Sequence, residues 1–86
     1  MTEARDGDLD EAPWRAWIDS VGDAVGVPTE GVRVADVHAL TRVVAHELAR
    51  PMAPVSAYLW GMACAVHPDA DPAALRDAIV AQVRAG

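Results

Sequence analysis

The sequence contains no Phe, no Asn and no Lys, and Cys64 is its only cysteine. A single cysteine cannot form a disulfide within the chain or a thiol pair for redox work, so a reducing, cytoplasmic setting is expected. All seven basic residues are Arg, and they stand against 13 acidic residues. Nucleic acid is therefore not expected as a partner, because binding a polyanion needs a face where basic residues dominate.

The acidic residues are concentrated at the start of the chain. The formal net charge is −6, and residues 1–12 hold five acidic side chains against Arg5 alone. Such a segment has too little apolar surface to pack, so residues 1–10 are expected to form a disordered acidic arm. One helical domain is expected over residues 11–86, and no signal peptide is expected because no apolar stretch follows the acidic start.

A long uncharged segment is the most unusual feature of the sequence. Residues Pro51 to Val66 include no Asp, Glu, Lys or Arg, although 23% of the chain is charged. The segment is shorter than the ~20 residues that span a membrane, and prolines interrupt its start, so no membrane contact is expected. It is expected to be buried, either in the core of this chain or against a partner.

Apolar spacing predicts four helices. The first is expected to begin near Asp10 to Pro13 and to end at Gly26, and the others to run over about residues 35–49, 54–66 and 72–85. Gly26 suits a left-handed C-cap, and Asp71 followed by Pro72 suits a helix start. Short connections between four helices predict an all-α fold, a small four-helix antiparallel bundle. The stripes predicted to face the core are Trp14, Trp17, Ile18, Val21 and Val25 in the first helix, and Val37, Leu40, Val44 and Leu48 in the second.

The third predicted helix is apolar on every side. One face carries large residues: Val55, Tyr58, Leu59, Met62 and Val66. The other face is the candidate helix–helix interface: Ala57, Trp60, Gly61, Cys64 and Ala65. Small residues in a row let another backbone approach closely, and a chain of this size has little material to surround such a helix. Two alternatives stay open, a homodimer and cover by this chain's own segments.

A cationic row precedes that helix. Arg42, His46 and Arg50 recur every four residues, and Ser56 follows at the next helix start. These four residues are a candidate anion-binding or partner-binding site, because guanidinium groups suit phosphates and acidic patches. The alternative is a solvated face with arginines loosely paired to Glu47 or the acidic arm. Pro51 and Pro54 predict a tight corner between the second and third helices.

Signals for catalysis are absent from the sequence. Cys64 and His67 are spaced like metal ligands, with His38 and His46 as further possibilities, but a structural zinc site usually has four ligands and several thiolates. His46 and Glu47 begin like a zinc-protease helix, yet Arg50 stands where the second His is required. We therefore expect no metal, no cofactor and no enzymatic activity.

The run VAHELARPMAPVSAYLWGMA resembles a signature, roughly V-A-H-x-V-x-R-P-x-A-P-L-[ST]-x-[FY]-L-x-G-x-A. The signature belongs to a small uncharacterised helical domain of high-GC bacteria. That domain occurs alone or fused to the molybdenum cofactor guanylyltransferase, and it is labelled a molybdopterin-guanine dinucleotide biosynthesis protein. The close match covers about Leu40 to Ala65, with Val55 in place of the usual Leu. It singles out these positions: His46, Arg50, Pro51, Pro54, Ser56, Tyr58 and Gly61.

The resemblance implies an accessory role, because this chain has no glycine-rich nucleotide-binding loop of the guanylyltransferase itself. The expected function is a non-enzymatic interaction domain associated with molybdenum cofactor biosynthesis, with the guanylyltransferase or a second copy as partner. The alternatives are a small anion- or nucleotide-binding module that uses His46 and Arg50, and a purely structural homodimerisation domain.

Overall fold

The computed structural model describes residues 6–86 of the chain, with side chains from residue 12 onward. Four α-helices and one 3₁₀ turn make up the described part, in this order: α1 (Asp6–Val25), α2 (Val34–Glu47), η1 (Arg50–Met52), α3 (Ala53–Val66) and α4 (Pro72–Ala85). No strand occurs within residues 6–86, so the predicted all-α class with four α-helices is confirmed. The chain divides into two compact units, Met1–His38 and Ala39–Gly86.

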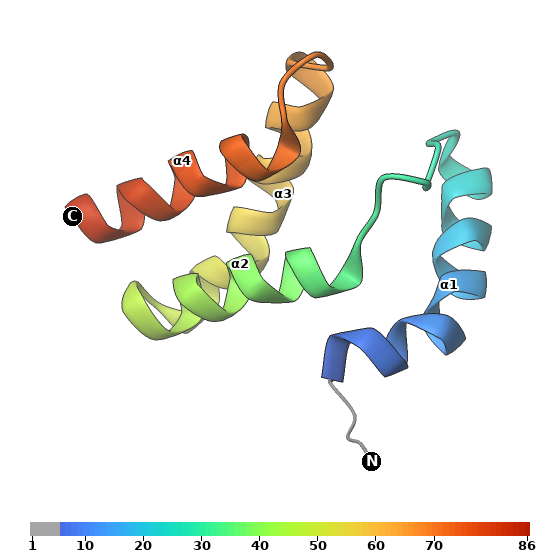
Figure 1. The fold of residues 1–86 in the computed structure, drawn as a ribbon, viewed down its shortest axis with the longest axis horizontal. Coiled ribbons are helices and arrows are strands. Elements are labelled where there is room, and N and C mark those ends of the chain that lie inside the picture. Colours follow the sequence, from blue (N-terminus) through green and yellow to red (C-terminus); the bar gives the residue numbers. More distant parts are fainter. Residues whose placement is uncertain (1–5) are drawn as a thin grey trace. The chain divides into compact units, whose positions relative to one another are not determined.

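In the first unit, α1 begins earlier than the sequence pattern predicts. Its first residue is Asp6, so Pro13 lies inside the helix rather than at its first turn. A proline in a helix interior removes one hydrogen bond and bends the helix, and Figure 1 shows α1 bent. Of the predicted acidic arm, residues 1–5 lie outside the described part of the chain, and residues 6–10 are the first positions of α1.

The predicted cap at the end of α1 is confirmed. Gly26 has a φ of +72°, the left-handed conformation that glycine adopts without steric cost. The Val27 amide then donates back to the Gly22 carbonyl at 2.8 Å, which turns the chain along α1. The apolar stripe of α1 is not buried as predicted, since Trp14, Trp17 and Val25 are each more than half exposed.

The inward residues of α2 are largely those that the spacing predicts. Leu40 and Val44 are the only fully buried large side chains in the described part of the structure, and Val37 is half-buried. Leu48 is an exception, because α2 ends at Glu47 and leaves Leu48 exposed. The amides of Leu48 and Ala49 both donate to the Val44 carbonyl, and this contact closes the helix.

The predicted corner between the second and third helices is present, with an added 3₁₀ turn. Ala49 is extended (φ −166°, ψ 138°), and Arg50 to Met52 form η1 before α3 begins at Ala53. Continuing α2 to Pro51 is unfavourable, because the proline has no N–H to donate and its ring clashes with the carbonyl four residues earlier. Pro54 lies in the first turn of α3, where its missing N–H leaves no helix hydrogen bond unmade.

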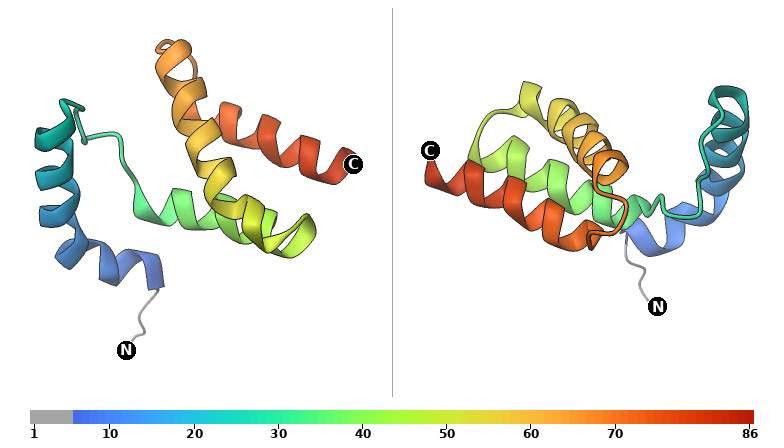
Figure 2. Two further views of the ribbon diagram at one scale, coloured as in Figure 1. Left: turned by 180° about the vertical axis from the view of Figure 1, so that it is seen from behind. Right: turned by 90° about the horizontal axis from the view of Figure 1, so that it is seen from above.

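In the second unit, α3 packs against α4, and α2 lies beside both helices (Figures 1 and 2). Asp71 caps α4 as predicted, its carboxylate accepting from the Ala73 amide at 3.1 Å. The Trp60 indole Nε1 donates to the Pro72 carbonyl at 2.9 Å and so links α3 to the start of α4. Successive helices reverse direction, and α2 and α4 therefore end at the same side of this unit (Figure 2).

Candidate interaction surfaces

The outward half of α3 is an exposed apolar surface. Five of its large side chains are 40–71% exposed, namely Val55, Tyr58, Leu59, Met62 and Val66. Leu48 and Met52, from the adjoining corner, are 56% and 40% exposed. These seven residues are called the α3 surface below. Its only side-chain polar group is the Tyr58 hydroxyl, so water has almost nothing to hydrogen-bond along this half of the helix.

The orientation of α3 follows from its contacts with α4. Trp60 donates to the Pro72 carbonyl at the start of α4, and Ala57, Trp60 and Cys64 are all half-buried. Gly61 and Ala65 are exposed, and a methyl group added to Gly61 would meet no atom within 4 Å. Of the candidate helix–helix interface, the structure therefore places three residues towards the chain itself and leaves two outside. The large apolar residues, rather than the small ones, make up most of the exposed surface.

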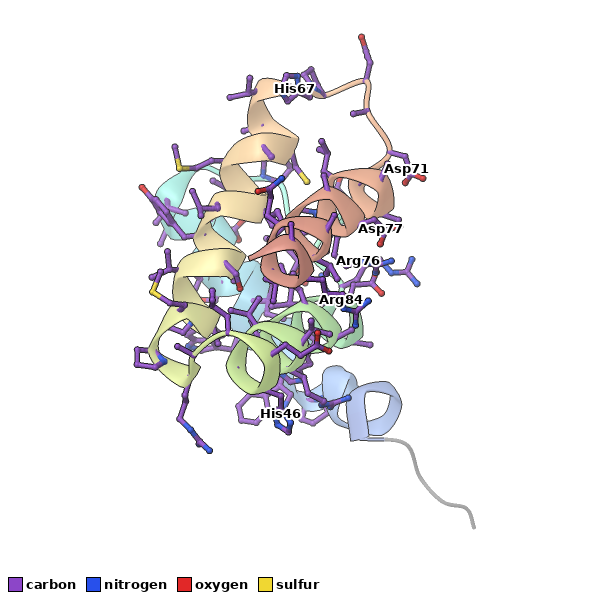
Figure 3. All side chains as sticks on the ribbon, turned by 90° about the vertical axis from the view of Figure 1, so that its left-hand side faces the viewer. His46, His67, Asp71, Arg76, Asp77 and Arg84 are labelled. Carbon is purple, nitrogen blue, oxygen red and sulfur yellow. The ribbon has the colours of Figure 1, made fainter. Side chains whose placement is uncertain are left out.

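The cationic residues do not form the continuous row that the spacing suggests. Arg42 and His46 are exposed one turn apart on α2, but α2 ends at Glu47 and Arg50 begins η1 after an extended residue. Pro51 is the reason, because it prevents α2 from reaching Arg50. His46 lies on the side of α2 that faces away from α4 (Figure 3). Within the described part of the chain, the side chains of Arg42, His46 and Arg50 form no hydrogen bond or ion pair, although His46 interacts electrostatically with the neighbouring Glu47.

The structure does not bring Ser56 to this cationic surface. The Ser56 side chain is buried, and its hydroxyl donates to the Ala53 carbonyl at 2.6 Å. Its role in the structure is thus to close the first turn of α3.

Glu47 forms an ion pair that the sequence did not reveal. Its two carboxylate oxygens accept from Arg84 Nε at 2.9 Å and from Arg84 Nη2 at 3.1 Å, a bidentate arrangement that joins the ends of α2 and α4. The hydrogen bond to Arg84 lowers the pKa of Glu47 from its ordinary value of 4.5, and the same contact raises the pKa of Arg84. The 37-residue separation of the two side chains hides this pair from any local pattern.

Sequence reasoning also missed a cluster that holds the segment after α1. The Arg15 guanidinium donates to the Thr29 carbonyl at 2.9 Å and to the Val32 carbonyl. Thr29 in turn donates its hydroxyl to Asp19 at 2.7 Å. Gly22 lies directly under this segment, since a methyl group there would be 2.3 Å from the Thr29 side chain and 2.7 Å from the Val27 carbonyl. The only sign of this close approach in the sequence is that Gly22 lies within a helical pattern, where glycine is unfavourable.

Neither a metal centre nor a membrane span is found in the described residues. No three His, Cys, Asp or Glu side chains in this part of the chain gather closely enough to hold a metal ion. His46 and His67 lie at opposite ends of α3 (Figure 3). None of the helices within residues 6–86 combines the length and the apolar character needed to cross a bilayer.

These features define a small all-α domain whose most distinctive surface is one side of an uncharged helix. The chain belongs to the family described as "Domain of unknown function (DUF6457)", whose model matches residues 9–85. No curated protein and no solved structure matches the chain.

Proposed function

We propose that this chain is a non-enzymatic, cytoplasmic interaction domain that binds another protein through the α3 surface. The main evidence for this proposal is the α3 surface itself. Its seven large apolar side chains are each 40–71% exposed, and α3 has no charged residue. Exposed apolar patches larger than a few hundred Å² are uncommon on soluble monomers and mark binding surfaces. Tyr58 and the two methionines also fit, because Tyr and Met are enriched in protein interfaces.

The process we assign to the domain is molybdenum cofactor biosynthesis, with the guanylyltransferase as partner. Support for this assignment comes from the resemblance of the run between Leu40 and Ala65 to the domain that is fused to that enzyme. The same run contains η1 and all of α3 except Val66, so it includes six of the seven residues of the α3 surface.

The test is a calorimetric titration of the guanylyltransferase with three forms of the full chain. Wild type is expected to bind, and Met62→Glu is expected to bind about 30-fold more weakly or not at all, as for a central interface residue. Ala81→Glu is the matched control, because it adds the same charge at an exposed position of α4 and is expected to bind like wild type. If wild type fails to bind the enzyme, the assignment to molybdenum cofactor biosynthesis is overturned.

A second candidate function is favoured by two exposed arginines. The side chains of Arg42 and Arg50 form no hydrogen bond or ion pair within the described part of a chain whose net charge is −6. Exposed guanidinium groups of this kind suit a phosphate or pyrophosphate. Under this alternative Arg50→Ala abolishes pyrophosphate binding and Gly61→Leu leaves it intact. Absence of pyrophosphate binding by wild type excludes the alternative.

A further inference from the structure

The proposed function leaves open what covers the α3 surface when no enzyme is present. We infer that a second copy of this chain covers it, with the two α3 helices packed antiparallel about a two-fold axis. The inference rests on the proposed function, because it concerns the same surface. It adds that the free protein is a homodimer, and that the enzyme and the second copy compete for one site.

The available area is sufficient for a weak specific dimer. Seven side chains that are 40–71% exposed offer roughly 600 Å² on one copy, since an aromatic side chain such as Tyr58 has on the order of 150–250 Å² and Val, Leu and Met have somewhat less. Two copies then bury roughly 1,200 Å², at the lower limit of specific protein interfaces. Area alone does not set affinity, and at this lower limit of size we expect a dissociation constant in about the micromolar range. The dimer would then separate on dilution and yield to a stronger partner.

The order of residues along α3 is self-complementary in the antiparallel direction. A two-fold axis midway between Leu59 and Met62 places Leu59 of one copy opposite Met62 of the other. The same axis places Val55 opposite Val66, so large apolar residues meet at the centre and towards both ends of the helix. Two-fold interfaces require this property, because each contact between residue i and residue j occurs twice.

Charges at the two ends of α3 also favour the antiparallel direction. Arg50 directly precedes α3, with Arg42 and His46 nearby on α2, whereas Asp69 and Asp71 follow α3. His46 and Asp71 lie at opposite ends of α3 (Figure 3). Arg50 and Asp69 are both exposed and without an ion-pair partner in the described part of the chain. Antiparallel packing brings the cationic end of one copy to the acidic end of the other, whereas parallel packing brings like charges together.

Sedimentation of the chain alone tests the dimer. Wild type at about 100 µM is expected to sediment as a dimer that dissociates in about the micromolar range. Met62→Glu is expected to be monomeric at this concentration, and Ala81→Glu to remain dimeric. Helical content by circular dichroism must be unchanged in both variants. A monomeric wild type overturns the inference, and so does a Met62→Glu variant that dimerises normally.

Charge exchange at low ionic strength tests the antiparallel direction. Arg50→Asp and Asp69→Arg are each expected to weaken the dimer about five- to tenfold, since a two-fold dimer contains the contact twice. The double variant is expected to restore wild-type association, and an absence of restoration overturns the antiparallel arrangement.

The two proposals fail separately. If the chain is monomeric and Met62→Glu loses enzyme binding, the proposed function stands and the homodimer is excluded. If the chain is dimeric and does not bind the enzyme, the homodimer stands and the assignment to molybdenum cofactor biosynthesis is excluded.

Discussion

At the scale of single residues, Arg15 and Gly22 fix the segment that follows α1 by different physical means. Arg15 donates to the carbonyl groups of Thr29 and Val32, and the Thr29 carbonyl also accepts from the Val32 amide at 3.0 Å. Gly22 contributes by having no side chain, because the segment passes where a Cβ atom would stand. Arg15 thus holds the segment by hydrogen bonds, and Gly22 allows it to pass close to the helix.

Replacing Gly22 by Ala is expected to destabilise the fold by about 1–3 kcal/mol, the usual cost of forcing extra volume into a packed site. Alanine's better helix propensity, up to about 1 kcal/mol, offsets only part of this cost. Urea unfolding followed by tryptophan fluorescence measures the change, since Trp14 and Trp17 lie on the same helix. Gly31→Ala is the control, because its added methyl group meets nothing within 4 Å. Equal stability of the two variants would contradict the close approach.

At the scale of elements, the pair of Glu47 and Arg84 ties the end of α2 to the end of α4. A carboxylate whose pKa is lower in the folded state than in the unfolded state stabilises the fold above its unfolded pKa. That contribution is lost as the pH falls through the folded pKa. The pair therefore supports this arrangement of helices at neutral pH and fails in acid.

Glu47→Gln is expected to be less stable than wild type at pH 7, with a constant difference down to about pH 5.5. Below pH 4.5 the difference is expected to narrow as the wild-type carboxylate becomes protonated. Urea unfolding at a series of pH values measures this difference in the free energy of unfolding between wild type and Glu47→Gln. An NMR titration of the Glu47 carboxyl carbon checks the cause, with a pKa below 4.5 in wild type and a return towards 4.5 in Arg84→Gln. A wild-type pKa at or above 4.5 would show that the pair is not formed.

Helices and caps were the predictable part of the fold because their signals are local. Gly26 and Asp71 act within a few residues of their own positions, and both were predicted correctly. The early start of α1 was missed because Pro13 more often begins a helix than lies inside one. The η1 turn was missed because only the end of α2, and not the form of the connection, follows from Pro51.

The candidate surfaces were predictable only in part, and α3 shows why. Its lack of charge is visible in the sequence, but a helix that is apolar on every side has no pattern to show which half faces outward. That choice depends on α4 and on the contact from Trp60 to Pro72. For Arg42, His46 and Arg50 the sequence does give a pattern, because the three residues recur at helical spacing. The structure does not follow that pattern, because α2 ends before η1 and separates Arg50 from the other two.

At the scale of the whole molecule, the chain has little material with which to cover its apolar helices. A chain of 86 residues buries only about 60% of the surface of its unfolded form. Leu40 and Val44 are the only fully buried large side chains in its described part, whereas the α3 surface remains open. A protein that leaves its most apolar helix half exposed is expected to complete its packing by association.

Methyl NMR of the full chain, on dilution of the protein and on addition of the guanylyltransferase, tests whether the α3 surface binds protein. Methyl signals of the α3 surface are expected to shift in both series, namely those of Val55, Leu59, Met62 and Val66. Dilution removes the second copy from this surface, and titration brings the enzyme to it. Signals of Leu40 and Val44 are expected to stay in place, since these residues are fully buried within the chain. If the α3 methyl signals remain unchanged in both series, the α3 surface binds neither the enzyme nor a second copy.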